Sequence, residues 1–319
     1  SALCNVGDRD TAGYETTMSA IVGGTTTIVD FAPQDPGTGL LDSIDYRINV
    51  RAKGKTCVDF ALHGMVTYLM DSVFDEVKEL PKKGVSSIKI FMAYNGSPLH
   101  VDDGSFYRIL EESGKVGLTV FVHAENGEIL NFLRDECVKK GQLAPKYHYV
   151  SRPPFTEAEG VRRAIYLAQQ TGTPLYVVHV TCKEALQEIQ EAQGKGINVG
   201  GETCTHYLTV TKDVLDDPDF NKAAQYVCSP ALRSQEHLDA LWEALNRGLL
   251  TAVSSDHCGI DLAELKQAGR DNFTNIPNGA PGAGDRLHML WTEGVAKGKI
   301  SKEKLVEVFP FATPSVHSI

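Results

Sequence analysis

One charged side chain lies where an apolar strand is expected. Lys89 is the central residue of SSIKIFMAY, where Ile88, Ile90 and Phe91 are its neighbours. β-Branched and aromatic residues on both sides predict a strand that is buried on both faces. A lone ammonium there must lose its charge, reach solvent at the strand end, pair with a carboxylate, or take part in chemistry.

Three more polar residues lie at or near the carboxyl ends of apolar segments. They are His123 in LTVFVHAE, His179 in PLYVVHVT and Asp256 at the end of LTAVSSD. Each has an ordinary alternative, because a lone histidine on a strand is more often a hydrogen-bonded core residue. Together, however, two imidazoles and a carboxylate suit Zn²⁺ or a similar divalent metal.

Strand and helix patterns alternate along nearly the whole chain. Such repeated units predict a parallel sheet with right-handed crossovers. A proline at position 81 is expected to end one of the helices. The predicted strands are 25–31, 59–66, 86–94, 118–125, 174–181, 197–204 and 250–256, and the predicted helices are 10–22, 72–80, 105–115, 129–140, 157–170, 183–193 and 235–247.

The sheet could be an open doubly wound sheet or a closed (β/α)8 barrel. No GxGxxG motif follows the first strand, which counts against the dinucleotide-binding form of the open sheet. In a barrel, active-site groups from different strands meet at the carboxyl-terminal rim. We therefore expect an α/β fold of the TIM-barrel type. The barrel needs eight strands and the pattern supplies seven, so the first strand would have to precede Ser1.

The composition excludes several classes of partner. The 319 residues are 42% hydrophobic and 23% charged, as in a soluble globular protein, and the net charge of −10 argues against nucleic acid and anionic membranes. There is no long apolar run and no signal-peptide pattern at the start. Seven cysteines without a CxxC pair indicate reduced thiols in a cytoplasmic protein.

The remaining histidines and cysteines are given no catalytic role. His63 is interpreted as a core residue, and His206 and His257 adjoin the rim without repeating the pattern. The cysteines expected to be small core residues are Cys57, Cys182, Cys204 and Cys228. The histidines expected to be solvated are His100, His148, His237, His288 and His317.

These segments resemble the signature segments of the dihydropyrimidinase and D-hydantoinase family of cyclic-amide amidohydrolases. The matching segments are KIFMAY, VHAENG, VHVTC, GETCTHYL, SSDHC and IPNGAPG, in the family's order and approximate spacing between Gly23 and about Phe309. The resemblance implies a hydrolase of pyrimidine degradation that opens a dihydropyrimidine or hydantoin ring to an N-carbamoyl amino acid.

The resemblance also implies a metal site. Lys89 would be carbamylated, which turns the buried cation into an anionic ligand that bridges two zinc ions. His123 and His179 would bind one zinc ion, and Asp256 would bind the other and carry protons during catalysis.

Substrate contacts are implied in the same way. Tyr94 would donate a hydrogen bond to the oxyanion that forms on the ring carbonyl. Ser229 and Asn278 match positions that hold the cyclic imide through main-chain contacts. The resemblance suggests a homotetramer.

The sequence departs from the family in two places. The family's first barrel strand carries a His-x-His pair for the second zinc ion, and no HxH occurs in these 319 residues. The family's accessory carboxyl-terminal β-sandwich is also missing, because the chain stops at PSVHSI. We expect residues 1–319 to form a single barrel domain, truncated at both ends as a fragment or as a natural short form, with weak second-site binding and low turnover.

Two alternatives remain open. The first is a related cyclic amidase, allantoinase or dihydroorotase, although KIFMAY and IPNG favour dihydropyrimidinase and hydantoinase. The second is a non-catalytic scaffold similar to the collapsin response mediator proteins. The missing HxH favours the scaffold, whereas the retained lysine, histidines and aspartate argue against it.

Overall fold

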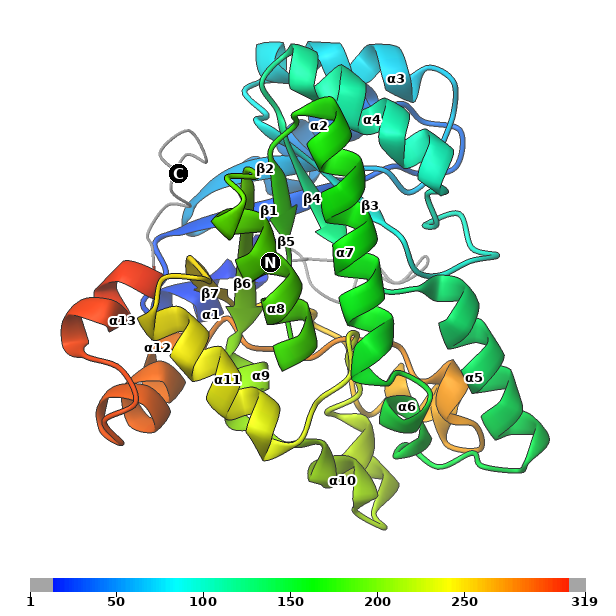
Figure 1. Ribbon diagram of the computed structural model, residues 1–319, viewed down its shortest axis with the longest axis vertical. Coiled ribbons are helices and arrows are strands. Elements are labelled where there is room, and N and C mark those ends of the chain that lie inside the picture. Colours follow the sequence, from blue (N-terminus) through cyan, green and yellow to red (C-terminus); the bar gives the residue numbers. More distant parts are fainter. Residues whose placement is uncertain (1–13, 310–319) are drawn as a thin grey trace.

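The computed structural model describes residues 14–309, and these form one parallel β-sheet with helices packed outside it (Figure 1). Every neighbouring pair of strands is parallel, and their order in space follows their order in the chain. All seven predicted strands are confirmed. They are β1 (Thr27–Pro33), β2 (Asp59–Met65), β3 (Ser87–Phe91), β4 (Thr119–His123), β5 (Leu175–Val177), β6 (Val199–Cys204) and β7 (Ala252–Ser254).

The longer helices α4, α7, α8 and α11 lie side by side along the outer face of the sheet (Figure 1). The α-helices are α1 (Thr17–Val22), α2 (Leu40–Tyr46), α3 (Val73–Glu76), α4 (Asp103–Lys115), α5 (Gly127–Lys139), α6 (Tyr147–Val150), α7 (Pro154–Thr171), α8 (Lys183–Gly194), α9 (Thr205–Thr209), α10 (Phe220–Ala224), α11 (Gln235–Asn246), α12 (Arg286–Met289) and α13 (Lys302–Val308). Shorter 3₁₀ or π segments are Tyr14–Thr16, Arg47–Ala52, Val77–Lys83, Lys212–Asp216, Lys266–Gly269, Phe273–Asn275 and Leu290–Val295.

Two of the predicted helix boundaries are wrong. The helix expected to end before Pro81 continues through it as the 3₁₀ segment Val77–Lys83, and the chain turns instead at Gly84, where φ is 75°. Helix α7 begins three residues before the predicted start, because Pro154 occupies its first turn, where the missing N–H costs nothing. The predicted helix over 10–22 begins in residues outside the described range.

Alternation along β3 directs one set of side chains into the core between the sheet and its helices and the other set toward the inside of the barrel. Ile88 and Ile90 are fully buried in the main core between the sheet and its helices. Lys89 and Phe91 point the other way, because successive side chains on a strand face opposite sides. The register with β4 places Lys89 opposite Phe121 and Phe91 opposite His123.

This arrangement is the (β/α)8 barrel type that the sequence predicts, and the described residues supply seven of its strands. Within residues 14–309 there is neither an eighth strand nor a β-sandwich. Over the same range, none of the helices combines the length and apolar character needed to cross a bilayer.

Replacing Ile90 by alanine should lower the free energy of unfolding by about 2–5 kcal/mol, since the truncation leaves a cavity in a fully buried layer. Urea unfolding of the two proteins measures the difference. Val306→Ala is the control, because that side chain is 68% exposed and its loss should change stability by no more than about 0.5 kcal/mol. Equal costs for the two variants would contradict burial of β3 on its outer face.

Candidate active site

A cavity of about 510 Å³ opens at the carboxyl ends of the strands. Its wall includes groups from both edges of the sheet and from the loops that follow the strands. All seven residues predicted from the sequence lie on this wall: Lys89, Tyr94, His123, His179, Ser229, Asp256 and Asn278.

Lys89 is only 3% exposed and lies among aromatic rings. Its Nζ atom is 4.8 Å from the ring centroid of Phe91 and 6.0 Å from that of Phe31. Contact with ring faces stabilises an ammonium by only about 0.5–2 kcal/mol, less than the cost of desolvating it.

His123 and His179 are neighbours on the cavity wall. The Nδ1 atom of His123 lies 3.0 Å from Nε2 of His179, and Nε2 of His123 lies 2.6 Å from Oε2 of Glu125. Burial lowers the pKa of both histidines, so both rings are neutral at pH 7. An ionised carboxylate only accepts hydrogen bonds, so Nε2 of His123 carries the proton and Nδ1 presents a lone pair.

This pair fits a divalent metal. Two nitrogens that bind one tetrahedral Zn²⁺ lie roughly 3.3 Å apart, close to the separation seen here. The Nδ1 atom of His179 is buried without a hydrogen-bond partner in the described part of the chain. Across residues 14–309 no three His, Cys, Asp or Glu side chains gather as a ligand cluster.

Backbone strain is concentrated at the same site. Among the described residues, the non-glycine residues with positive φ are Tyr94 at 67°, His179 at 43° and Asp256 at 39°. Each follows the end of a strand, and each conformation costs on the order of 1 kcal/mol or more. Strain of this kind persists where the surroundings fix a side chain in a required direction.

Tyr94 is a hydrogen-bond donor at neutral pH. Burial raises the pKa of its hydroxyl to about 12, although the Arg152 guanidinium, 5.9 Å from the ring centroid, opposes that rise. A protonated phenol beside the cavity can stabilise negative charge that develops on a carbonyl oxygen.

Ser229 and Asn278 lie on loops that share one anchor. The carbonyl oxygen of Val227 accepts hydrogen bonds from Gly279 N at 3.0 Å and from Lys266 Nζ at 2.9 Å. The main chain before Ser229 is thereby fixed to the main chain after Asn278.

Comparison with known proteins gives a consistent result. A search of protein-family models finds none that matches. The chain is 44% identical over 292 residues to a D-hydantoinase from Ralstonia pickettii, covering 92% of this chain and 63% of the relative. It is 35% identical over 297 residues to a dihydropyrimidinase from Rattus norvegicus, covering 92% of this chain and 57% of the relative.

Solved structures agree. The crystal structure of a D-hydantoinase from Bacillus sp. AR9 matches with a TM-score of 0.91 and 40% identity, covering 96% of this chain and 67% of that one. A dihydropyrimidinase from Brevibacillus agri matches with a TM-score of 0.89 and 42% identity, covering 92% and 64%. This chain belongs to the D-hydantoinase and dihydropyrimidinase family. It spans between 54% and 64% of the length of the curated relatives it matches.

Several polar residues of this hydantoinase-family cavity were not predicted from the sequence. Glu202 lines the cavity, accepts a hydrogen bond from Ser254 Oγ at 2.8 Å, and has its pKa raised by burial. His63, interpreted as a core residue, is buried but also lines the cavity, with Nδ1 2.5 Å from Ser87 Oγ. Burial lowers the pKa of His63 to about 3, so it is neutral. The only feature of the sequence that could have pointed to Glu202 and His63 was their position on predicted strands.

Other expectations for single residues are wrong. His148 and His237 are buried rather than solvated, and His148 donates from Nε2 to the Cys228 carbonyl at 2.7 Å. Cys57 is exposed, whereas Cys182, Cys204 and Cys228 are buried as expected. His317 lies outside the described residues.

The anchor at Val227 gives a prediction for stability against pH. Burial lowers the pKa of Lys266 from 10.5 to about 8, so the unfolded chain holds this proton more tightly. The free-energy cost of burying the charged Lys266 ammonium is therefore at its full value below pH 8, and it disappears as the pH rises toward 10.5. Relative to Lys266→Met, the natural protein should therefore gain about 2 kcal/mol of stability between pH 7 and pH 10.

Urea unfolding at several pH values measures this difference. Lys195→Met controls for the loss of one positive charge, because the Lys195 side chain is 67% exposed. A difference between the natural protein and Lys266→Met that stays constant with pH would contradict the prediction.

Proposed function

We propose that this chain is the catalytic barrel domain of a metal-dependent hydrolase that opens hydantoin or dihydropyrimidine rings to N-carbamoyl amino acids. The observation that carries the proposal is the meeting of Lys89, His123, His179 and Asp256 on one cavity wall, with two imidazole nitrogens 3.0 Å apart. Membership of the family supports the reaction type.

The side chains on the wall would hold one zinc ion tightly and would contribute to a weaker site for a second. His123 and His179 would bind one ion, Asp256 would bind the other, and carbamylated Lys89 would be a ligand to both. Carbamylation joins the uncharged lysine nitrogen to the carbon of CO₂ and releases a proton, so a buried cation becomes an anion. When bound, such ions polarise an amide carbonyl and make water nucleophilic at neutral pH.

The chain's own residues would handle the proton and the developing charge. Asp256 would take a proton from the attacking water and deliver it to the ring nitrogen as the bond between carbonyl carbon and nitrogen breaks. Tyr94, protonated at neutral pH, would donate a hydrogen bond to the carbonyl oxygen as it becomes negative. The main chain at Ser229 and Asn278 would hold the cyclic imide.

The comparisons favour this reaction over the alternatives. The curated relatives described above are a hydantoinase and a dihydropyrimidinase, which supports these rings over allantoin and dihydroorotate. We also propose a cytoplasmic homotetramer. All six cysteines in the described range are free thiols, as expected in a reducing compartment, and the tetramer rests on the family resemblance.

Metal content is the first test. The chain prepared with zinc and bicarbonate should hold one tightly bound zinc ion by elemental analysis after dialysis, and both His123→Ala and His179→Ala should lose it. A second ion would show that other groups complete the second site. Absence of zinc from the natural chain would contradict the metal site and favour the scaffold.

Ring opening is the second test, measured with hydantoin and dihydrouracil beside allantoin and dihydroorotate. Tyr94→Phe should lower kcat by about 10²–10³ and Asp256→Asn by about 10²–10⁴, since each removes a transition-state interaction. Tyr166→Phe is the matched control, because that ring is 64% exposed. Faster turnover of allantoin or dihydroorotate would reassign the substrate.

A further inference from the structure

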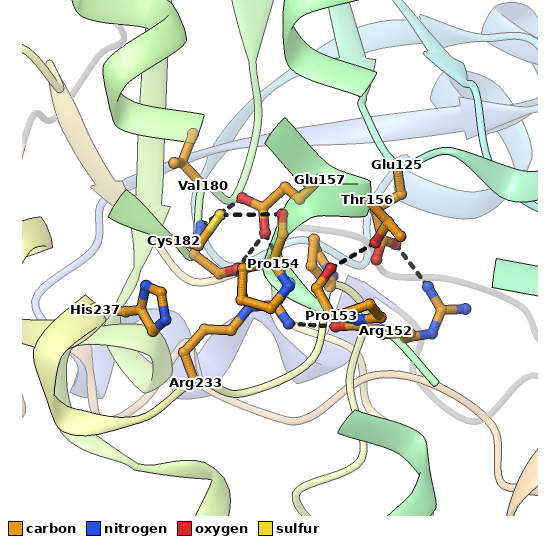
Figure 2. Close-up of polar contacts among 12 residues, drawn as sticks. Glu125, Arg152, Pro153, Pro154, Thr156, Glu157, Val180, Cys182, Arg233 and His237 are labelled. Carbon is orange, nitrogen blue, oxygen red and sulfur yellow. Dashed lines mark hydrogen bonds and ion pairs between the residues drawn. The ribbon is translucent and has the colours of Figure 1, made fainter. Parts of the chain in front are cut away.

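Four charged side chains, all largely buried, form a network that contacts His123 and the segment after His179. Glu125, Glu157 and Arg233 are at most 3% exposed and Arg152 is 13% exposed, and together they carry no net charge. Figure 2 shows them gathered between the ends of β4 and β5 and the first turn of α7. None of them was predicted as a site residue.

The first ion pair holds the ring of His123. Oε2 of Glu125 accepts from Arg152 Nη1 at 2.7 Å and from His123 Nε2 at 2.6 Å. The ion pair with arginine keeps an acceptor on this side of the imidazole, so the ring proton stays on Nε2. The lone pair on Nδ1 is left facing His179.

The second ion pair holds the chain after His179. Arg233 Nη2 lies 3.0 Å from Glu157 Oε2, and Arg233 Nε donates to Thr181 Oγ1 at 2.8 Å. Oε1 of Glu157 accepts from the backbone N–H of Thr181 at 2.8 Å, and its Oε2 accepts from the Thr181 hydroxyl. Thr181 is two residues beyond His179, so Glu157 and Arg233 fix the end of the strained turn.

The two ion pairs are joined through the main chain. Arg233 Nη1 donates to the carbonyl oxygen of Arg152, the residue whose side chain pairs with Glu125 (Figure 2). Helix α7 approaches the end of β4 closely, because a Cβ atom at Gly160 would lie 2.7 Å from the Ala124 carbonyl oxygen. One rigid unit therefore supports both histidine segments.

Stability alone is a poor explanation for this network. Desolvating four charges costs several kcal/mol for each ion, and apolar replacements of buried ion pairs are often neutral or stabilising. Fixing ligand direction is a task that apolar side chains cannot perform, because an imidazole tautomer is selected by a hydrogen-bonding partner.

We propose that Glu125, Arg152, Glu157 and Arg233 are positioning residues that pre-orient His123 and His179 for a divalent metal. Glu125 and Arg152 set the tautomer and direction of the His123 ring. Glu157 and Arg233 set the backbone at His179. This inference rests on the proposed function only for the identity of the ligand, since the hydrogen bonds at His123 and Thr181 are made by the chain's own residues.

The first experiment measures zinc affinity by competition with a chromogenic chelator, which needs no turnover. Glu125→Leu removes the acceptor and should weaken zinc binding by about 10–100-fold, and Glu125→Gln, which keeps an acceptor oxygen, should restore part of the loss. Thr181→Val tests the second ion pair by a mild change and should weaken binding in the same direction.

Asp30→Asn is the matched control. Asp30 is a fully buried carboxylate 3.5 Å from Arg47 Nε, and it does not line the cavity, so its loss should disturb stability and leave zinc affinity unchanged. Zinc affinity equal to that of the natural protein in Glu125→Leu and Thr181→Val would overturn the proposal. So would equal weakening in Asp30→Asn.

The second experiment reads the ring itself in the metal-free protein. Solid-state ¹⁵N spectra of protein labelled at histidine ring nitrogens, with His123 assigned from the His123→Ala spectrum, should show His123 protonated on Nε2. Glu125→Leu should shift that proton toward Nδ1, whereas Asp30→Asn should not. An unchanged His123 tautomer in Glu125→Leu would overturn the inference even if the natural protein binds no zinc, so failure here is distinct from failure of the proposed function.

Discussion

The pairing of β3 with β4 is the constraint on which the cavity depends. Because the strands are parallel, their carboxyl ends lie at the same edge, and the register places Phe91 opposite His123. Alternation then directs Ile88 and Ile90 into the helical layer and leaves Lys89 inside. A shift of one residue would exchange these faces and move a lysine into the main core, so the apolar layer outside the sheet enforces the polar rim inside it.

The rim concentrates features that oppose folding. Three residues have left-handed backbone conformations, and neutral histidines, a buried lysine and four further charges lie within the same region. Each is unfavourable by itself. They persist because the surrounding core of buried aliphatic side chains holds the strand ends in place. Ile88 and Ile90 belong to that core, and their burial contributes part of the free energy that offsets these unfavourable features.

The sequence was informative wherever function and structure depend on short-range pattern. All seven strands were predicted, because each is a short apolar run bounded by turns, and the rim residues Lys89, His123 and Asp256 were found by their position on those runs. The failures share a different cause. His148 lies in a helix of four residues, too short to show which face is buried, and its burial comes from packing against Cys228, 80 positions away. Cys57 was judged by residue type, which does not determine exposure.

The charge network behind the histidines shows the same limit most clearly. Glu125 pairs with a residue 27 positions away and Glu157 with one 76 positions away, so no local pattern reveals either partner. Removing one charge also leaves its partner buried without a counter-charge. That lowers stability whether or not the network has a role in function. Loss of stability therefore cannot reveal its purpose. The informative property is direction: Glu125 can select the nitrogen of His123 that keeps its proton, whereas the Asp30 carboxylate, which pairs with Arg47, accepts a hydrogen bond from the Tyr14 hydroxyl.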